Sequence, residues 1–436
     1  MTEAAALEWA RVTGPEGLDL LRRYFGGDQT AAPGMTAIIN AAEAGQYDAD
    51  YAGNPDLERI HVTTSCHLMV MALLNRLNGL SAAQFYKDDA LRFVRTNCLV
   101  QRMLGFERLT LGWPVYGFGA EILGQTMIYP TDQAPGSDPG VPLLSDENWR
   151  DMPAYDPDHH VAGAVRENLQ HMGRLSGIEP VAHLPAPYSL AAEIFGQEPL
   201  IGALALEPEF VRELLDLIVT RVLTPWCDDL VSNVPDVWLE LSDASGSPMF
   251  VGPENFLKYV VDPVRRLIEE NQWGHRVFAA NYRGDLPAGA PTRGRRKKRP
   301  AAVSPISFDL LLQAKKLCCP NFLMRLEADA APLDDYVQAA IELGMPLYLG
   351  IGAVRLDRNS VPDLAAAKIE LHDTAKERAE FIKQVSDVLQ DQGRPRASLP
   401  WPGDLYIEDT NAETSFELIG AVLAGAKLTG TRPDTP

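Results

Sequence analysis

Cysteine is scarce in this sequence, since 436 residues contain only five: Cys66, Cys98, Cys227, Cys318 and Cys319. They are too few and too scattered for a disulfide framework, which indicates a reducing compartment. No run approaches about 18 uninterrupted apolar residues, the length of a membrane-spanning helix. The first residues, MTEAAALEWARVTG, lack the basic and apolar regions of a signal peptide. We therefore expect a cytoplasmic protein with no membrane partner.

Positive charge is also in short supply. The 39 Lys and Arg face 59 Asp and Glu, which gives a net charge of −20. Such a charge repels nucleic acid and anionic membranes, so we expect neither as a partner. One segment departs from this balance: DLPAGAPTRGRRKKRPAAVSP (285–305) carries six basic residues between prolines. It is either a solvated surface insertion or a lid that attracts an anionic cofactor or an acidic partner.

Two kinds of binding motif are missing as well. No GxGxxG or GxxxxGK[ST] motif occurs between a strand and a helix, so no phosphate-binding loop is indicated. The pairs His159-His160, Cys66-His67 and Cys318-Cys319 have no further ligands at useful spacing. The sequence therefore predicts no metal site.

What the sequence does contain, from about Ile60 onward, is an alternation of short apolar runs with helical patterns. This order is typical of βα units around a parallel sheet. A Pro-, Asp- and Gly-rich excursion over 126–160 is expected to hold a small hairpin. We predict seven strands: LTLGWP (109–114), PVAHLP (180–185), DVWLEL (236–241), RVFAAN (276–281), FLMRLE (322–327), PLYLGIG (346–352) and DLYIED (404–409).

An eighth strand is not obvious, but a closed barrel accommodates seven or eight βα units more economically than an open sheet. The predicted fold class is therefore α/β, a TIM (β/α)8 barrel over 59–436. An N-terminal helical extension over 1–58 precedes it, and 285–305 interrupts it as an insertion loop.

In such a barrel the chemistry lies where the strands end. Several polar residues occupy these positions, and acidic groups from several strands are expected to converge. Crowded carboxylates raise one another's pKa, which suits a general acid or base, although a metal would suit them equally. Each residue could instead have an ordinary structural role. The strand-end candidates are His183, Glu240, Asp243, Asn281, Tyr282, Arg283, Glu327, Glu408 and Asp409.

Two long runs carry a family resemblance: PAPYSLAAEIFGQEPLIGALALEPEFVRELLDLIV (185–219) and DVWLELSDASGSPMFVGPENFLKYVVDPVRRLIEE (236–270). They resemble the uroporphyrinogen decarboxylase superfamily, and the stretch 77–121 is similar too. The resemblance covers roughly 60–425 and implies a single TIM barrel. The Arg/Gln/Gly-rich segment with which the decarboxylase binds its substrate has no counterpart in 1–60. The layout is more similar to the corrinoid-dependent methyltransferases of the superfamily.

Those methyltransferases bind zinc through a His-x-Cys-Gly motif and a late cysteine. The matching positions here read Asn281-Tyr282-Arg283-Gly284, and GDLYIEDT (403–410) has no cysteine. Neither soft ligand remains, so zinc is not expected. An Asn, Arg and carboxylate cluster would instead orient an oxygenated substrate and move protons.

The resemblance implies a methyltransferase that moves a methyl group between an oxygenated small-molecule substrate, aromatic ones included, and cobalamin, a corrinoid held on a partner protein. A decarboxylase-type lyase, with Arg283 on the carboxylate and Asp243 as the proton donor, is the first alternative, and a non-catalytic binding subunit is the second. A homo-oligomer is compatible with each. The predicted catalytic residues are Asp243, Arg283 and Glu408, and the predicted substrate-binding residues are His183, Glu240, Asn281, Tyr282, Glu327, Trp113 and Tyr188.

Overall fold

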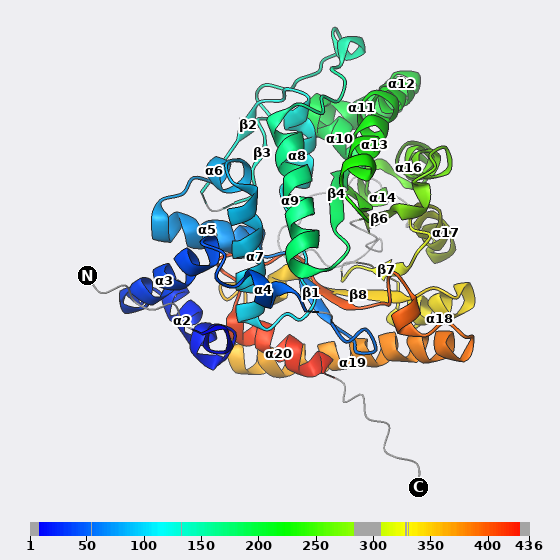
Figure 1. Ribbon diagram of the computed structural model, residues 1–436. Coiled ribbons are helices and arrows are strands. Elements are labelled where there is room, and N and C mark those ends of the chain that lie inside the picture. The colour runs from blue at the N-terminus through cyan, green and yellow to red at the C-terminus, as the bar shows by residue number, and fades with distance from the viewer. Residues whose placement is uncertain are drawn as a thin grey trace.

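The computed structural model describes residues 8–53, 55–131, 133–282, 307–327, 329 and 331–427, with the backbone alone for 278–282 (Figure 1). Arg283 and the basic segment 285–305 lie outside the described residues, so the predictions made for them are not tested. No helix among the described residues is long and apolar enough to cross a membrane.

Parallel strands form the centre of the molecule. One sheet has the order β4-β5-β6, and a second has the order β1-β9-β8-β7. All pairs in both sheets are parallel, so the predicted βα organisation is confirmed as a mixed α/β fold. The strands are β1 (Val62–Thr64), β4 (Val181–Pro185), β5 (Trp238–Asp243), β6 (Val277–Tyr282), β7 (Leu323–Arg325), β8 (Leu347–Ile351) and β9 (Leu405–Ile407).

Six of the seven predicted strands are present, but LTLGWP (109–114) is not a strand. The side-chain amide of Gln101 occupies both backbone groups of Thr110, accepting from its N–H at 2.9 Å and donating to its carbonyl at 2.7 Å. These are the groups that a strand would use to pair with its neighbours. The segment still lies beside β1, because the Thr110 hydroxyl donates to the carbonyl of Thr64 at 2.6 Å.

The sequence pattern missed β1. Only three residues, Val62–Thr64, belong to it, and they pair with Leu405–Ile407 of β9. A strand of this length with two threonines has no apolar run that would reveal it. The small hairpin expected in 126–160 is confirmed: β2 (Met127–Ile128) pairs antiparallel with β3 (Gly136–Ser137).

Helices cover the outside of both sheets, and many begin at residues that satisfy free backbone N–H groups. Ser81 and Gln84 form a reciprocal capping box, and Asp89, Ser307 and Asp363 cap other helices. The helices are α1 (Trp9–Val12), α2 (Pro15–Phe25), α3 (Ala32–Glu43), α4 (Asp48–Tyr51), α5 (His67–Asn78), α6 (Ala82–Lys87), α7 (Ala90–Leu104), α8 (Val115–Ile122), α9 (His160–Ser176), α10 (Pro187–Phe195), α11 (Gln197–Leu206), α12 (Pro208–Ile218), α13 (Thr224–Asn233), α14 (Pro248–Val251), α15 (Pro253–Asn255), α16 (Asp262–Glu269), α17 (Phe308–Cys318), α18 (Leu333–Leu343), α19 (Leu364–Asp391) and α20 (Phe416–Ala426).

The N-terminal helices pack on the rest of the chain. Helices α2, α3 and α4 contact α7, and the Arg95 guanidinium of α7 binds Asp48 of α4 at 2.6 Å. Phe25 also contacts Phe416 of α20, with ring centroids 5.7 Å apart. Helices α19 and α20 lie side by side beneath the sheet that contains β1 and β8 (Figure 1). The apolar core therefore runs from the first helices to the last one.

Candidate active site

A cavity of about 440 Å³ lies among the strands, and residues of both sheets line it. Along three strands the lining residues alternate, because successive side chains of a strand point to opposite faces. They are 181 and 183 on β4, 240 and 242 on β5, and 322, 324 and 326 on and around β7. The cavity volume is that of a site for a small organic ligand.

Gly350 of β8 helps to keep this space open. A Cβ atom at position 350 would lie 2.5 Å from the hydroxyl oxygen of Tyr406. Because glycine has no Cβ, the Tyr406 ring can lie directly against β8. A larger residue at position 350 would displace this ring. This close packing of Tyr406 against β8 contributes to the free volume of the cavity.

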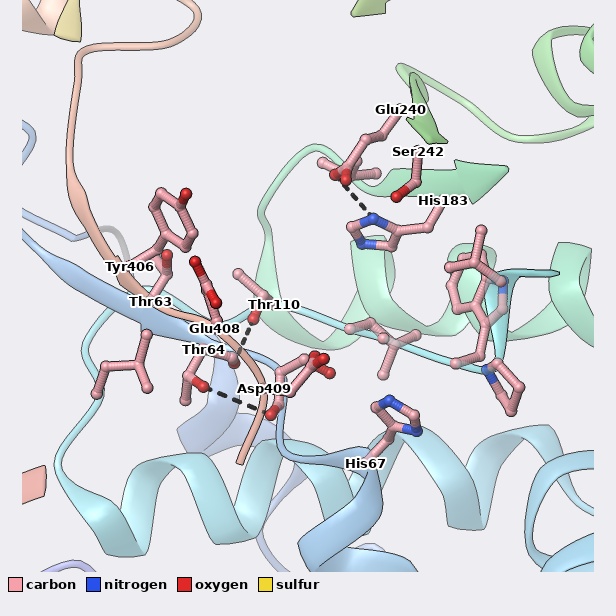
Figure 2. A pocket seen from close by; sticks show the side chains of 18 of the residues that line it. Thr63, Thr64, His67, Thr110, His183, Glu240, Ser242, Tyr406, Glu408 and Asp409 are labelled. Carbon is pink, nitrogen blue, oxygen red and sulfur yellow. Dashed lines mark hydrogen bonds and ion pairs between the residues drawn. The ribbon is translucent and has the colours of Figure 1, made fainter. Parts of the chain in front are cut away.

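His183 and Glu240 form a pair in the middle of the cavity. They occupy opposite positions on the adjacent strands β4 and β5, and the His183 Nδ1 lies 2.8 Å from the Glu240 carboxylate (Figure 2). Burial lowers the pKa of His183, but the Glu240 carboxylate, the backbone of Leu111 and the more distant Asp409 together outweigh burial, and the pKa is raised. The protonated imidazole is therefore favoured more than in a free histidine.

Trp113 fixes the orientation of this imidazole. The two rings meet edge to face, with centroids 5.4 Å apart, and both residues line the cavity. All three residues, Trp113, His183 and Glu240, are among the predicted substrate-binding residues. The structure brings them together around one cavity.

A second histidine reaches the cavity from the start of α5. His67 is fully buried, and its Nδ1 lies 2.7 Å from the hydroxyl of Tyr86. Burial, together with the nearby His183, lowers the pKa of His67 to about 3, so this ring is neutral. The sequence pattern offered His67 only as a metal ligand beside Cys66, and its place in the cavity was missed because β1, the strand that ends just before it, was missed.

Glu408 and Asp409 follow β9 and line the cavity across from His183 (Figure 2). Asp409 has a φ of +31°, a left-handed conformation that costs a non-glycine residue free energy. The next residue explains how it is held: Thr410 donates from its N–H and its hydroxyl to the carbonyl of Ser65, at 3.1 and 2.9 Å. These two hydrogen bonds to the loop after β1 hold the backbone of Asp409 in this conformation. Glu408 lies at the carboxyl end of β9, where the sequence predicted it.

Glu327 does not line the cavity. Its carboxylate accepts from Arg355 at 2.6 Å and from Arg378 at 2.7 Å, and it also accepts from the N–H of Gly352. Burial opposes ionisation, but the two guanidinium groups prevail and lower the pKa of Glu327. The structure thus places Glu327 in an ion-pair cluster that joins β7, β8 and α19.

Asp243 and Tyr188 also lie away from the cavity lining. Asp243 and Tyr188 are both fully buried. The Asp243 Oδ1 accepts from the hydroxyl of Ser189 at 3.0 Å and from the N–H of Gly246 at 2.6 Å. Among the described residues, the Asp243 Oδ2 and the Tyr188 hydroxyl have no hydrogen-bond partner. Burial raises the pKa of Asp243 to about 6.

The backbones of Asn281 and Tyr282 lie beside Ser242 and Asp243 in the sheet. This places the two residues at the carboxyl end of β6, where the sequence analysis expected them. Within the described parts of the chain, no three His, Cys, Asp or Glu side chains are grouped so that they could hold a metal ion. The roles predicted for Asn281, Tyr282 and Arg283 stay predictions.

Comparison with known proteins yields a likeness of fold. No family model matches the chain, and no curated protein matches its sequence. A solved structure described as a methyltransferase from Methanosarcina mazei superposes with a TM-score of 0.55 at 12% sequence identity. The match covers 88% of this chain and 96% of that one. The chain therefore shares its overall fold with that protein over nearly its whole length.

Proposed function

We propose that this chain is a methyltransferase with the fold and chemistry of the uroporphyrinogen decarboxylase superfamily. We further propose that its two parallel sheets are two parts of one TIM barrel. The barrel is supported by one common cavity, which alternate residues of strands from both sheets line. Methyl transfer is supported by the long fold match to a protein described as a methyltransferase.

The observation that carries the chemistry is the partly buried His183–Glu240 pair. In our proposal the substrate is a neutral methyl ether, and its oxygen lies at the His183 imidazole. When the C–O bond breaks, the methyl group leaves without the bonding electron pair, which stays on the oxygen. A protonated His183 gives its proton to that oxygen, so an alcohol or phenol departs rather than its anion. His183 then takes up a proton from solvent.

The other residues of the site bind and orient the ether. Trp113 supplies an aromatic wall beside the imidazole, and the neutral His67 can form a hydrogen bond without competing for the proton. Tyr116 and Ser242, whose hydroxyls lie 2.8 Å apart, can orient an oxygen at the carboxyl end of β5. Glu240 holds the imidazole and stabilises its charge.

A corrinoid fits this chain as a partner's group rather than as a resident one. A volume of about 440 Å³ suits a small ligand, whereas a corrin ring with its axial groups is much larger. When bound at the mouth of the cavity, a corrinoid would supply the nucleophile that accepts the methyl group or the methyl group itself. Glu408 and Asp409 would then lie on the side of the cavity nearest the carboxyl ends of the strands.

The test is to incubate the protein with cob(I)alamin and a methoxy-aromatic compound and to record the visible spectrum. We expect methylcobalamin to form, and the demethylated phenol to appear in equal amount. A His183→Gln variant should form neither. If the wild-type protein forms no methylcobalamin with any methyl ether, with free cobalamin or with a corrinoid protein, the proposal fails.

A further inference from the structure

The cavity extends over the whole depth of the strands. Glu408, Asp409 and Tyr116 line it at their carboxyl ends, whereas Val181, Phe322 and Trp401 line it at their amino ends. On β4 and β5 the lined stretch runs from Val181 to the level of Ser242, which is paired with Pro185. Four residues of a parallel strand rise about 13 Å.

The two ends differ in chemistry. The carboxyl end holds the polar groups described above. At the amino end, aromatic rings from β5, β8 and the loops before β7 and β9 gather in one cluster. Phe322 contacts Tyr348 and Trp401 at centroid distances of 4.5 and 5.9 Å, and Trp401 meets Trp238 at 5.4 Å. Met324 and Val181 pack against the same cluster.

The charged groups at the amino end already have partners. The Arg108 guanidinium binds the buried Asp404 at 2.7 Å and lies over the Trp401 ring. Glu179 accepts from the indole N–H of Trp238 at 2.5 Å. Arg396 binds the same Asp404 carboxylate at 3.0 Å. A ligand that reaches this end therefore meets mainly aromatic and aliphatic surface, beside charged groups that are already hydrogen-bonded within the protein.

We propose that the site takes an elongated substrate, in which a methylated oxygen at one end is attached to an apolar body that reaches the aromatic cluster at the amino ends of the strands. This inference deepens the proposed function and rests on it for the reacting end. The apolar body is bound by burial of its surface, which also determines how far the methylated oxygen sits from His183. A substrate that is too short would bind weakly and would not be held at the imidazole.

The probes are anisole and a series of 4-n-alkylanisoles from methyl to nonyl, with dissociation constants measured by calorimetry. Each buried methylene should tighten binding about fourfold, until the chain exceeds the depth of the cavity and the gain stops. The carboxylated analogue 4-(4-methoxyphenyl)butanoate should bind more weakly than 4-pentylanisole, because its charge would be buried against aromatic rings beside the Glu179 carboxylate, and Arg108 is already paired with Asp404. A dissociation constant that does not change with chain length, or tighter binding of the carboxylate, would overturn the proposal.

Val181→Phe should fill the amino end of the cavity. We expect it to abolish the gain from the longer chains while leaving anisole within about twofold of wild type. The matched control is Val141→Phe, at a side chain that is 56% exposed, and it should follow the wild-type series. Equal weakening of anisole and 4-pentylanisole by Val181→Phe would count against the inference. If that variant does not fold, Val181→Ala replaces it and should move the end of the gain to a longer chain; no movement would contradict the proposal.

Binding and turnover separate this inference from the proposed function. Chain-length-dependent binding without methyl transfer to cob(I)alamin would leave the elongated site standing and remove the methyltransferase. Methyl transfer with no dependence of binding on chain length would support the methyltransferase and overturn the elongated site.

Discussion

Glu240 and Asp243 lie three residues apart on the same strand, yet they occupy two different environments. Glu240 faces the cavity and pairs with His183, whereas Asp243 faces the helices outside the sheet and binds Ser189 and Gly246. The difference follows from the two-residue period of a strand, since even-numbered positions 240 and 242 point inward here. Two carboxyl groups near one strand end therefore need not serve one site.

The two environments also favour opposite states of charge. On the inner side, the Glu240 carboxylate favours a protonated His183 despite burial. On the outer side, burial disfavours the Asp243 carboxylate, and the hydrogen bonds from Ser189, Ser245 and Gly246 offset this effect only in part. We therefore assign acid–base chemistry to the inner side and a structural role in holding the turn 244–246 to the outer one.

The largest effect should come from His183→Gln. Removing the proposed general acid should lower turnover of a methyl ether by roughly 10²- to 10⁴-fold. The measurement is the initial rate of methylcobalamin formation, with far-ultraviolet circular dichroism to check the fold. His372→Gln is a matched control, since His372 lies on α19 with nearly half of its side chain exposed, and it should keep wild-type turnover. Similar rates in both variants would remove His183 from the chemistry.

Asp243→Asn tests the outer side of β5. Because the folded-state pKa of Asp243 is raised from 3.8 to about 6, wild-type stability should fall as pH rises from about 4 to 6 and show no further loss from this group above that. Asparagine keeps the oxygen that accepts from Ser189 and Gly246 but removes the buried charge. The variant should therefore be more stable at pH 8, by roughly 1–3 kcal/mol.

Chemical denaturation at pH 4, 6 and 8 measures this difference. The surface variant Asp387→Asn provides the comparison, because Asp387 pairs with Lys383 in solvent. Turnover of Asp243→Asn should stay near that of the wild type. A hundredfold loss of turnover, with the fold intact, would return Asp243 to the catalytic machinery that the sequence analysis predicted.

Glu240→Gln should have a smaller effect than loss of the imidazole. The glutamine can still bond to His183 but no longer favours its charge, so the pKa of His183 should fall. The protonated form would then be lost at a lower pH, and the rate should decline earlier as pH rises. Since a hydrogen bond to a charged group contributes about 1.5–3 kcal/mol, turnover at neutral pH should drop roughly 10- to 100-fold. A pH–rate profile that keeps its wild-type position would show that Glu240 does not tune His183.

These contrasts explain what the sequence could predict. Apolar runs revealed six strands because buried parallel strands are continuous apolar segments. They could not reveal β1, which is short and contains two threonines, and so the place of His67 in the cavity was missed. The sequence did not show whether the Asp243 side chain faces the cavity or the helices. Alternate residues of a strand face opposite sides, and which set faces inward depends on how the strand packs in the sheet. Glu327 met a similar limit, since its arginine partners come from residues 28 and 51 positions later.

Asp409→Asn should have the smallest effect and tests how far the charge environment of His183 extends. Among the groups that raise the pKa of His183, Asp409 acts through space and contributes less than Glu240. Asparagine has nearly the same shape and tolerates the positive φ at this position, so stability should change by less than about 0.5 kcal/mol. The decline of turnover with rising pH should begin slightly earlier than in wild type, in the same direction as for Glu240→Gln but by less. Because Asp409 is exposed, salt should screen its charge, so this small shift should shrink further at 0.5 M salt. A shift as large as that of Glu240→Gln would mean that Asp409 affects the pKa of His183 as strongly as Glu240 does. The charge of His183 would then not depend mainly on its neighbour on β5.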